Sequence, residues 1–367
     1  MRQKLIKNPV FKFLSSIKIT VACLSLLFVL TFWGTIDQTF NGLYHAQETF
    51  FHSWFFWGFG FLPLPGAQLV LWVLFINLVC VAITRFVYRA SHIGILVLHF
   101  GLLTYFISAF VTLNGVQESN LNLLEGASSN ISSAYHEWEL SLWKQERNTK
   151  QVTAFDTDGI KPGQMLDFGN DWKVRVRAYY PNSQAYTKVP EPNPKIFSIS
   201  GIQELKQVAT FNEPEKNLPG GTFTIDGPKS QGNVLLYGGE TTPTPLGYDH
   251  FIQLRKKKFP MPFLLKLIDF KMEKHPNTEI ARRYESLVEI THENVARQVV
   301  ISMNKPLRFK DFTVYQASYA IDALGREYST LAVVKNSGRL LPYIASGITF
   351  VGLALHFLFM ALAPRIK

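Results

Sequence analysis

The sequence predicts an integral membrane protein with four transmembrane α-helices and a large, β-rich (all-β) extracytoplasmic domain. Four stretches contain no Asp, Glu, Lys or Arg. Each holds an apolar run of about 20 residues, the length that a helix needs to cross a hydrocarbon core of about 30 Å. The long polar segment between the third and fourth runs alternates apolar and charged residues, which is typical of strands. The uncharged stretches are 19–36, 49–84, 91–117 and 340–364.

The four apolar runs fix the expected helices at 17–36, 67–88, 92–113 and 340–362. The first run follows basic residues, as in a signal peptide, but Trp33–Ile36 is a poor cleavage site, so we expect a retained helix. The expected organisation is a cytoplasmic N-terminus with the first helix (1–36), an outer amphipathic aromatic loop (37–66), the second and third helices (67–113), the extracytoplasmic β-rich domain (114–338), and the fourth helix with a cytoplasmic tail (339–367).

The distribution of basic residues predicts the orientation. Lys and Arg flank the first helix on its N-terminal side, occur in the turn 85–90 and close the chain, whereas the loop 37–66 has two acidic residues and no basic ones. By the positive-inside rule, both termini lie in the cytoplasm and the segment 114–338 lies outside. We therefore expect a multi-pass protein of a bacterial cell (inner) membrane, with a thylakoid membrane as the alternative.

Aromatic residues crowd the outer loop between Tyr44 and Trp57. Such rings are enriched at the headgroup boundary of a bilayer. We expect a short helix lying along the outer surface, ended by the Pro63–Gly66 segment.

Period-two alternation recurs along the polar segment, for example in 137–142, 172–178 and 285–290. Further short runs with strand composition follow towards the C-terminal end, and segments rich in Pro, Gly and polar residues separate them. About 225 residues are enough to bury a hydrophobic core. We expect long loops at 181–194, 212–226 and 238–249.

Composition excludes several classes of function. The net charge of +10 argues little for nucleic-acid binding, because much of the excess sits beside membrane ends. Both cysteines, Cys23 and Cys80, lie in apolar runs, so the outer domain has no disulfide, C-x-x-C pair or thiolate metal site. We find no G-x-S-x-G elbow, H-E-x-x-H motif or Gly-rich phosphate loop.

Histidines inside the apolar runs are the strongest functional signal, since ionisable residues are costly there. His92 and His99 lie on one face of the third helix, because seven steps of 100° nearly complete two turns. His356 is expected at a depth similar to that of His99. A neutral imidazole in hydrocarbon needs a hydrogen-bond partner or a metal, and haem iron accepts imidazole. Each histidine is thus either a haem ligand or a structural residue bonded across a helix interface.

Two further features leave alternatives open. His45 and His52 in the aromatic loop are also seven residues apart, and either could meet a cofactor on the outer side. Gly94 and Gly101 accompany the histidines of the third helix. These glycines allow close approach either of another helix or of a flat ligand.

An ordered set of motifs resembles the ResB-like family of the System II cytochrome c maturation pathway. The resemblance covers nearly the whole chain, is weakest over 145–255, and extends to the order of three helices, a large outer domain and a last helix. The motifs are Gly42-Leu43-Tyr44, Gln47, Phe51-His52-Ser53-Trp54-Phe55, Pro63-Leu64-Pro65-Gly66, Asn77, Arg85, His92-Ile93-Gly94, His99-Phe100-Gly101, Tyr284-Glu285-Ser286, Met303-Asn304-Lys305-Pro306-Leu307 and Val314-Tyr315-Gln316-Ala317-Ser318-Tyr319.

This resemblance implies a membrane subunit that acts with a CcsA-type (ResC-type) haem-handling protein, here a separate polypeptide. The pair would carry haem b across the membrane and join it to the C-x-x-C-H thiols of an apocytochrome c. The family's haem-ligating histidine on the third helix corresponds to His99 or His92, with His99 favoured for its depth. The chain would be a subunit of a cytochrome c synthase complex rather than a stand-alone enzyme. Because it lacks C-x-x-C, another protein would reduce the thiols.

Two other functions remain as alternatives. A haem-free scaffold would stabilise the partner and bind apocytochrome c through the β domain. A transporter or sensor unrelated to cytochromes is less favoured, since the sequence lacks paired repeats and broken, polar-lined helices.

Overall fold

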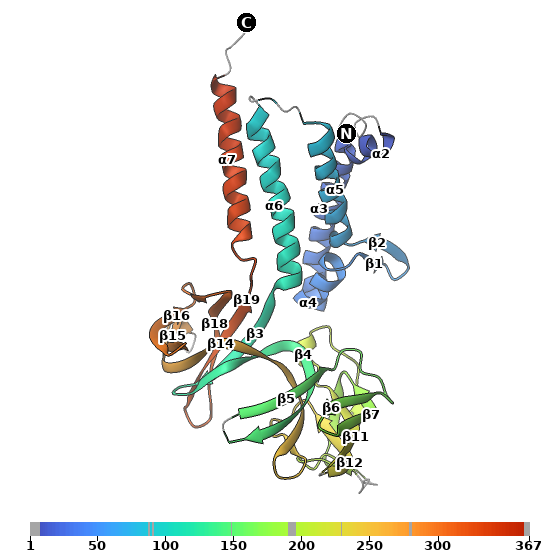
Figure 1. Cartoon of the computed structure of the whole chain (residues 1–367), viewed down its shortest axis with the longest axis vertical. Coiled ribbons are helices and arrows are strands. Elements are labelled where there is room, and N and C mark those ends of the chain that lie inside the picture. The colour runs from blue at the N-terminus through green and yellow to red at the C-terminus, as the bar shows by residue number, and fades with distance from the viewer. Residues whose placement is uncertain are drawn as a thin grey trace. The chain divides into compact units, whose positions relative to one another are not determined.

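The computed structural model describes residues 8–86, 89, 92–147, 149–189, 196–228, 230–278 and 281–362. The chain divides into two compact units. The first comprises residues 1–117 and 335–367, and the second comprises residues 118–334. The first unit is helical and the second is built of strands (Figure 1).

Four helices of the first unit are long and apolar enough to cross a membrane, as the sequence predicts. They have 18–25 residues and a mean hydropathy of 1.9–2.3. The first runs five residues beyond the expected end at 36. The side chain of Asn41 donates to Asp37 Oδ1 at 2.9 Å one turn earlier, and Gly42, with φ of 85°, then ends the helix. The four are α3 (Ile17–Asn41), α5 (Ala67–Thr84), α6 (Ile93–Gly115) and α7 (Leu341–Leu362).

The aromatic loop differs from the expected surface helix. Only its first part is helical, as α4 (Leu43–Ala46) and the π-helical turn η1 (Gln47–Phe51). The second part is an antiparallel hairpin of β1 (Phe55–Gly58) and β2 (Leu62–Pro65). The prolines of β2 fit because the strand pairs on one side only, so their missing N–H groups cost no ladder bond. Residues 63–65 therefore lie in a strand instead of ending a helix, and Gly66 is the N-terminal cap of α5.

Asn77 of α5 joins this helix to the start of the chain. Its amide donates to the carbonyls of Leu14 and Ser16, which flank the break between α2 (Pro9–Leu14) and α3. Thr20 donates to the side-chain oxygen of Asn77 at 2.7 Å. Asn77 is 2% exposed. The helix break thus leaves carbonyls that a polar residue in an otherwise apolar helix satisfies.

Helices α6 and α7 pack with their backbones in close approach (Figure 1). A Cβ added to Gly94 would lie 2.3 Å from the backbone nitrogen of His356, and one on Gly352 would lie 2.3 Å from that of Leu98. Gly101 faces Thr349 in the same way. The two helices are therefore antiparallel and held together through small residues.

The strand unit contains a ten-stranded antiparallel sheet and a five-stranded sheet. The larger sheet curls around one core, since residues from the strands at both its ends, Ile301 of one and Leu307 of the other, share that core. Its path is β16 (Val295–Ser302), β15 (Ala281–His292), β14 (His250–Lys274), β4 (Ser128–Glu146), β3 (Gln117–Leu124), β19 (Glu327–Lys335), β18 (Phe312–Ile321) and β17 (Leu307–Phe309), with β5 (Thr149–Asp156) beside β4 and β13 (Thr244–Pro245) beside β14.

A second core lies between the five-stranded sheet and the far halves of β4 and β14. Trp172, Val174 and Phe223 fill it, each at most 2% exposed. The longest strand, β14 with 25 residues, contributes buried residues to both cores of the β-rich unit. The five-stranded order is β6 (Met165–Gly169), β7 (Trp172–Tyr180), β11 (Gly220–Gly227), β12 (Ser230–Tyr237) and β9 (Ile196–Phe197), and a separate pair joins β10 (Glu204–Gln207) to β8 (Ser183–Tyr186).

Candidate functional site

His99 lies on α6, with its Nδ1 hydrogen-bonded and its Nε2 without a partner among the described residues. Its Nδ1 is 2.8 Å from the carbonyl oxygen of Ile95. Because a carbonyl only accepts, Nδ1 carries the proton and Nε2 keeps its lone pair. The half-buried ring meets Phe86 edge-on, with centroids 4.6 Å apart. A neutral imidazole with a free Nε2 is the donor that an axial haem ligand requires.

The other two predicted ligands lie elsewhere on the helices. His92 is exposed and occupies the N-terminal cap of α6. The backbone of His356 abuts Gly94, so His356 is about five residues, or roughly 7 Å of helical rise, from the level of His99. The expectation that His99 and His356 share one depth is thus wrong. His356 is half-buried beside Phe357 and forms no hydrogen bond within the described part of the chain.

The glycines of α6 are used for helix packing. Gly94 and Gly101 both contact the backbone of α7, and Gly94 and Gly101 are buried. Of the two readings that the sequence leaves open, the structure shows close helix approach at these positions. This side of α6 is separate from the His99 ring, which faces Phe86 beyond the end of α5.

The two histidines of the aromatic loop differ in their contacts. His52 Nδ1 lies 2.7 Å from Glu48 Oε1, one helical turn earlier. His45 Nε2 lies 3.4 Å from Thr49 Oγ1 and 3.9 Å from Asp37 Oδ2. His52 therefore holds its Nε2 without a partner among the described residues, whereas His45 uses its Nε2 within the loop.

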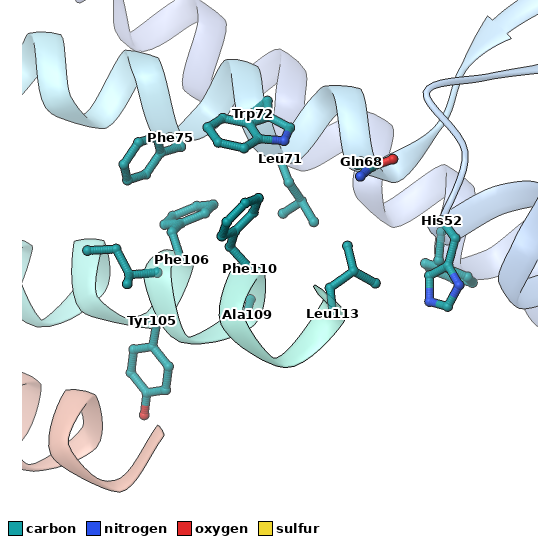
Figure 2. A pocket seen from close by; sticks show the side chains of 12 residues that line it. His52, Gln68, Leu71, Trp72, Phe75, Tyr105, Phe106, Ala109, Phe110 and Leu113 are labelled. Atoms are coloured by element: carbon teal, nitrogen blue, oxygen red, sulfur yellow. The ribbon is translucent and has the colours of Figure 1, made fainter. Parts of the chain in front are cut away.

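A cavity of about 550 Å³ is lined by residues of α5 and α6. At its wall, Trp72 and Phe75 of α5 contact Phe110 and Phe106 of α6 (Figure 2). Paired rings support the walls, with Trp72 and Phe110 centroids 5.6 Å apart and those of Phe75 and Phe106 5.7 Å apart. The sequence analysis did not predict this cavity. The aromatic residues are nevertheless a signal for it, because they are three residues apart on α5 and four apart on α6.

Residues of the β-rich unit that carry the family resemblance form a buried polar network. Ser286 of β15 donates to Gln316 Oε1 of β18 at 2.7 Å and contacts Ser329 Oγ of β19 at 2.8 Å. Tyr284 donates to the carbonyl of Ala317 at 3.1 Å. Ser286 and Ser329 have no exposed surface. These motif residues hold strands of the curled sheet together.

A basic cluster lies where β14 pairs with β4, between the parts of β14 that contribute to the two cores. Lys256 Nζ donates to the carbonyl of Tyr135 at 2.7 Å and lies 4.2 Å from the centre of the Trp138 ring. Lys258 Nζ donates to Ser133 Oγ at 2.7 Å. Burial lowers the pKa of Lys256, which nearby Glu215 partly offsets.

Together these features define a polytopic membrane protein with partly buried imidazoles in its helices and a two-core β-rich domain. The model of the ResB-like family matches residues 88–327, and the chain belongs to this family. Protein NrfI of Wolinella succinogenes is 28% identical over 118 residues, which is 30% of this chain and 13% of NrfI. The chain thus matches a small part of that relative. Family membership supports a role in cytochrome c biogenesis.

Proposed function

We propose that this protein is a membrane subunit of cytochrome c biogenesis that helps to carry haem across the membrane and to present it with apocytochrome c for thioether attachment. It acts with a CcsA-type membrane protein, and haem b is held transiently between the two. Both termini lie in the cytoplasm of a bacterial cell, and the β-rich unit lies outside the inner membrane. The family match supports this proposal, and so does His99, whose Nε2 has no partner in the part of the chain that the structure describes.

His99 carries the haem-binding part of the proposal. The Ile95 carbonyl fixes the ring orientation and tautomer, so Nε2 is presented without loss of further rotamer freedom. Bound haem would supply the iron centre and the two vinyl groups that receive the cysteine thiols. The second ligand would come from the partner, and the position of His356 about five residues from the level of His99 supports this.

The haem-free scaffold is the second candidate function, and one observation favours it. The bond from His99 Nδ1 to Ile95 already gives this imidazole a polar partner inside the helix. A structural histidine in an apolar environment needs no more than this. The scaffold would stabilise the CcsA-type partner and bind apocytochrome c through the β-rich unit.

Haem content of the complex separates the two functions. The chain is co-expressed with its partner and purified in detergent, and haem is quantified by the pyridine haemochrome assay. We expect a Soret band that His99→Ala removes or shifts, while His275→Ala, at an exposed position of the β-rich unit, leaves it unchanged. His92→Ala tests the other ligand position.

The outcome that contradicts haem handling is equally clear. A colourless complex, from cells in which deletion of this gene lowers partner abundance, identifies the scaffold. Normal haem content and cytochrome c yield in both His99→Ala and His92→Ala show that the ligand assignment is wrong.

A further inference from the structure

The hairpin of β1 and β2 has one face packed against α3. The ring centre of Phe56 lies 5.8 Å from that of Trp33, and Phe56 is 7% exposed. The ring centre of Phe59, in the turn between the strands, lies 5.3 Å from that of Trp33. A Cβ added to Gly58 would come within 3.5 Å of Trp33. Figure 1 shows the hairpin beside α3 and α5, and these contacts hold it against α3.

The opposite face of the hairpin is apolar and exposed. Phe55 and Trp57 point to this face and are 62% and 70% exposed. Their cross-strand partners are Pro65 and Pro63. Phe61, beside the turn, is 75% exposed. The hairpin contains only Trp, Phe, Leu, Pro and Gly, so the indole N–H of Trp57 is its one polar side-chain group. An apolar surface of this kind marks a contact with lipid or with protein.

The hairpin contacts α3 at the level where the apolar part of this helix ends. Trp33 lies in the uncharged stretch 19–36, close to its last residue. Elsewhere on this part of α3, Phe28 and Phe32 are exposed, as side chains that face acyl chains are. Strand β2 leads through Gly66 directly into α5, another apolar helix. The exposed face of the hairpin therefore adjoins the surface that these helices present to lipid.

The backbone of β2 lowers the cost of placing the hairpin edge in a membrane interface. The N–H of Gly66 donates to the carbonyl of Trp54 at 2.9 Å. Because bonded and non-bonded pairs alternate in an antiparallel pair, the nitrogens of Pro65 and Pro63 point away from β1. Proline has no N–H, so the outer edge of β2 carries no unpaired donor at these positions. Open strand edges are excluded from hydrocarbon, and the headgroup boundary, where water reaches the carbonyls, is the level that fits.

We propose that the hairpin β1–β2 is inserted into the bilayer at the boundary between headgroups and acyl chains, with Trp57 and Phe61 in contact with lipid. The surface helix expected from the sequence would lie along the membrane, whereas the hairpin enters it. A protein partner is the poorer fit, because protein interfaces carry a polar rim and this face offers only an indole N–H. Tryptophan is enriched at the headgroup boundary. The proposal is independent of haem handling.

Spin labels on single cysteines test the depth of the hairpin. The complete chain is reconstituted in nanodiscs of phosphatidylethanolamine and phosphatidylglycerol, and collisions of the label with oxygen and with a water-soluble nickel chelate are measured. We expect labels at Trp57→Cys and Phe61→Cys to favour oxygen, as a label at Phe28→Cys on exposed α3 surface does, whereas Asp158→Cys favours nickel. The unchanged chain, whose two cysteines are buried, gives the background.

Fluorescence quenching tests the same contact without a label. The emission lost in Trp57→Phe, relative to the unchanged chain, reports on Trp57. We expect this emission to fall in nanodiscs whose phospholipids carry brominated acyl chains. Trp172→Phe is the matched control, because Trp172 is buried in the second core of the β-rich unit and its emission should be the same in both kinds of nanodisc.

Each other result overturns the inserted hairpin. Nickel access at Trp57→Cys and Phe61→Cys equal to that at Asp158→Cys, or an unquenched Trp57, places the hairpin in water. If protection from nickel appears only when the CcsA-type partner is reconstituted with the chain, the hairpin docks on that partner. Spin–spin broadening at Phe61→Cys with little access to oxygen assigns this face to a second copy of the chain. The haem content of the complex is a separate readout, so the proposed function is tested independently.

Discussion

Polar side chains inside the apolar helices differ in how fully their hydrogen-bonding groups are used. Asn77 uses both its amide nitrogen and its oxygen. His99 uses Nδ1 only, and His356 makes no hydrogen bond within the described residues. A buried polar group in a membrane is costly unless it is paired. Full pairing at Asn77 indicates a structural residue, whereas the spare nitrogen of His99 is compatible with a ligand.

Asn77→Leu should destabilise the helical unit. The substitution leaves the carbonyls of Leu14 and Ser16 and the Thr20 hydroxyl without their partner, a loss of roughly 1–2 kcal/mol. Thermal unfolding of the purified protein in detergent measures the effect. Asn114→Leu is the control, because the exposed Asn114 only bonds the carbonyl of Phe110 one turn earlier. Equal melting temperatures for both variants would show that the Asn77 bonds contribute nothing.

Asp322 gives the β-rich unit a contribution that depends on pH. Its carboxylate accepts from the backbone nitrogens of Arg326 and Leu324 and from the Arg326 guanidinium, and these bonds hold the pKa of Asp322 below its usual range. The folded pKa is lowered, so the stabilisation is present above the unfolded value of about 3.9 and is lost as pH falls through the folded pKa. We expect the Asp322→Asn variant to unfold more easily than the unchanged chain at pH 6, and we expect this difference to shrink as the pH falls below about 3.9. A difference that persists in acid would contradict the linkage.

At the scale of secondary-structure elements, the close packing of α6 against α7 requires small residues at the points where the two backbones meet. Gly352→Ala brings a Cβ within 2.3 Å of the Leu98 nitrogen, and the backbones must separate. Such overpacking costs about 1–3 kcal/mol. Gly347→Ala on the same helix meets nothing within 4 Å and should be neutral or slightly stabilising, since Ala favours helix. The two variants are compared by the yield of folded protein and by the melting temperature. An unchanged melting temperature for Gly352→Ala would contradict the close packing.

Sequence patterns predict elements well where one physical signal dominates. The absence of charge marks all four long helices. The end of α3 lies beyond the expected residue 36, because Asn41 extends the helix and Gly42 ends it, and α5 ends at Thr84 instead of at residue 88. The hairpin β1–β2 is not predictable in the same way, since aromatic residues suit both a surface helix and a strand. The level of His356 depends on the α6–α7 register, which Gly94 and Gly352 fix through tertiary contact.

The candidate site was likewise predictable only in part. The sequence shows that His99 lies in an apolar run, and the structure adds that its Nδ1 is the bonded ring nitrogen. The cavity needs two helices to be placed side by side, so the sequence shows its aromatic residues but not the space between them. The Ser286–Gln316–Ser329 network joins residues up to 43 positions apart, which no local pattern predicts.

At the scale of the whole molecule, the predicted orientation in the membrane decides on which side the β-rich unit lies. Cysteine labelling tests this orientation.

Cys23 and Cys80 are each 5% exposed, so the native chain should react little with a membrane-impermeant maleimide. Single new cysteines can then report each side: Asp158→Cys in a turn of the β-rich unit and Lys12→Cys in α2, both exposed. Basic residues beside α3 and the polar β-rich unit favour opposite sides for the two. In intact cells with a permeable outer envelope, we expect Asp158→Cys to be labelled and Lys12→Cys to be labelled only after the membrane is opened. The reverse pattern would place the β-rich unit in the cytoplasm, away from the compartment in which apocytochrome c receives haem, and would contradict the proposed function.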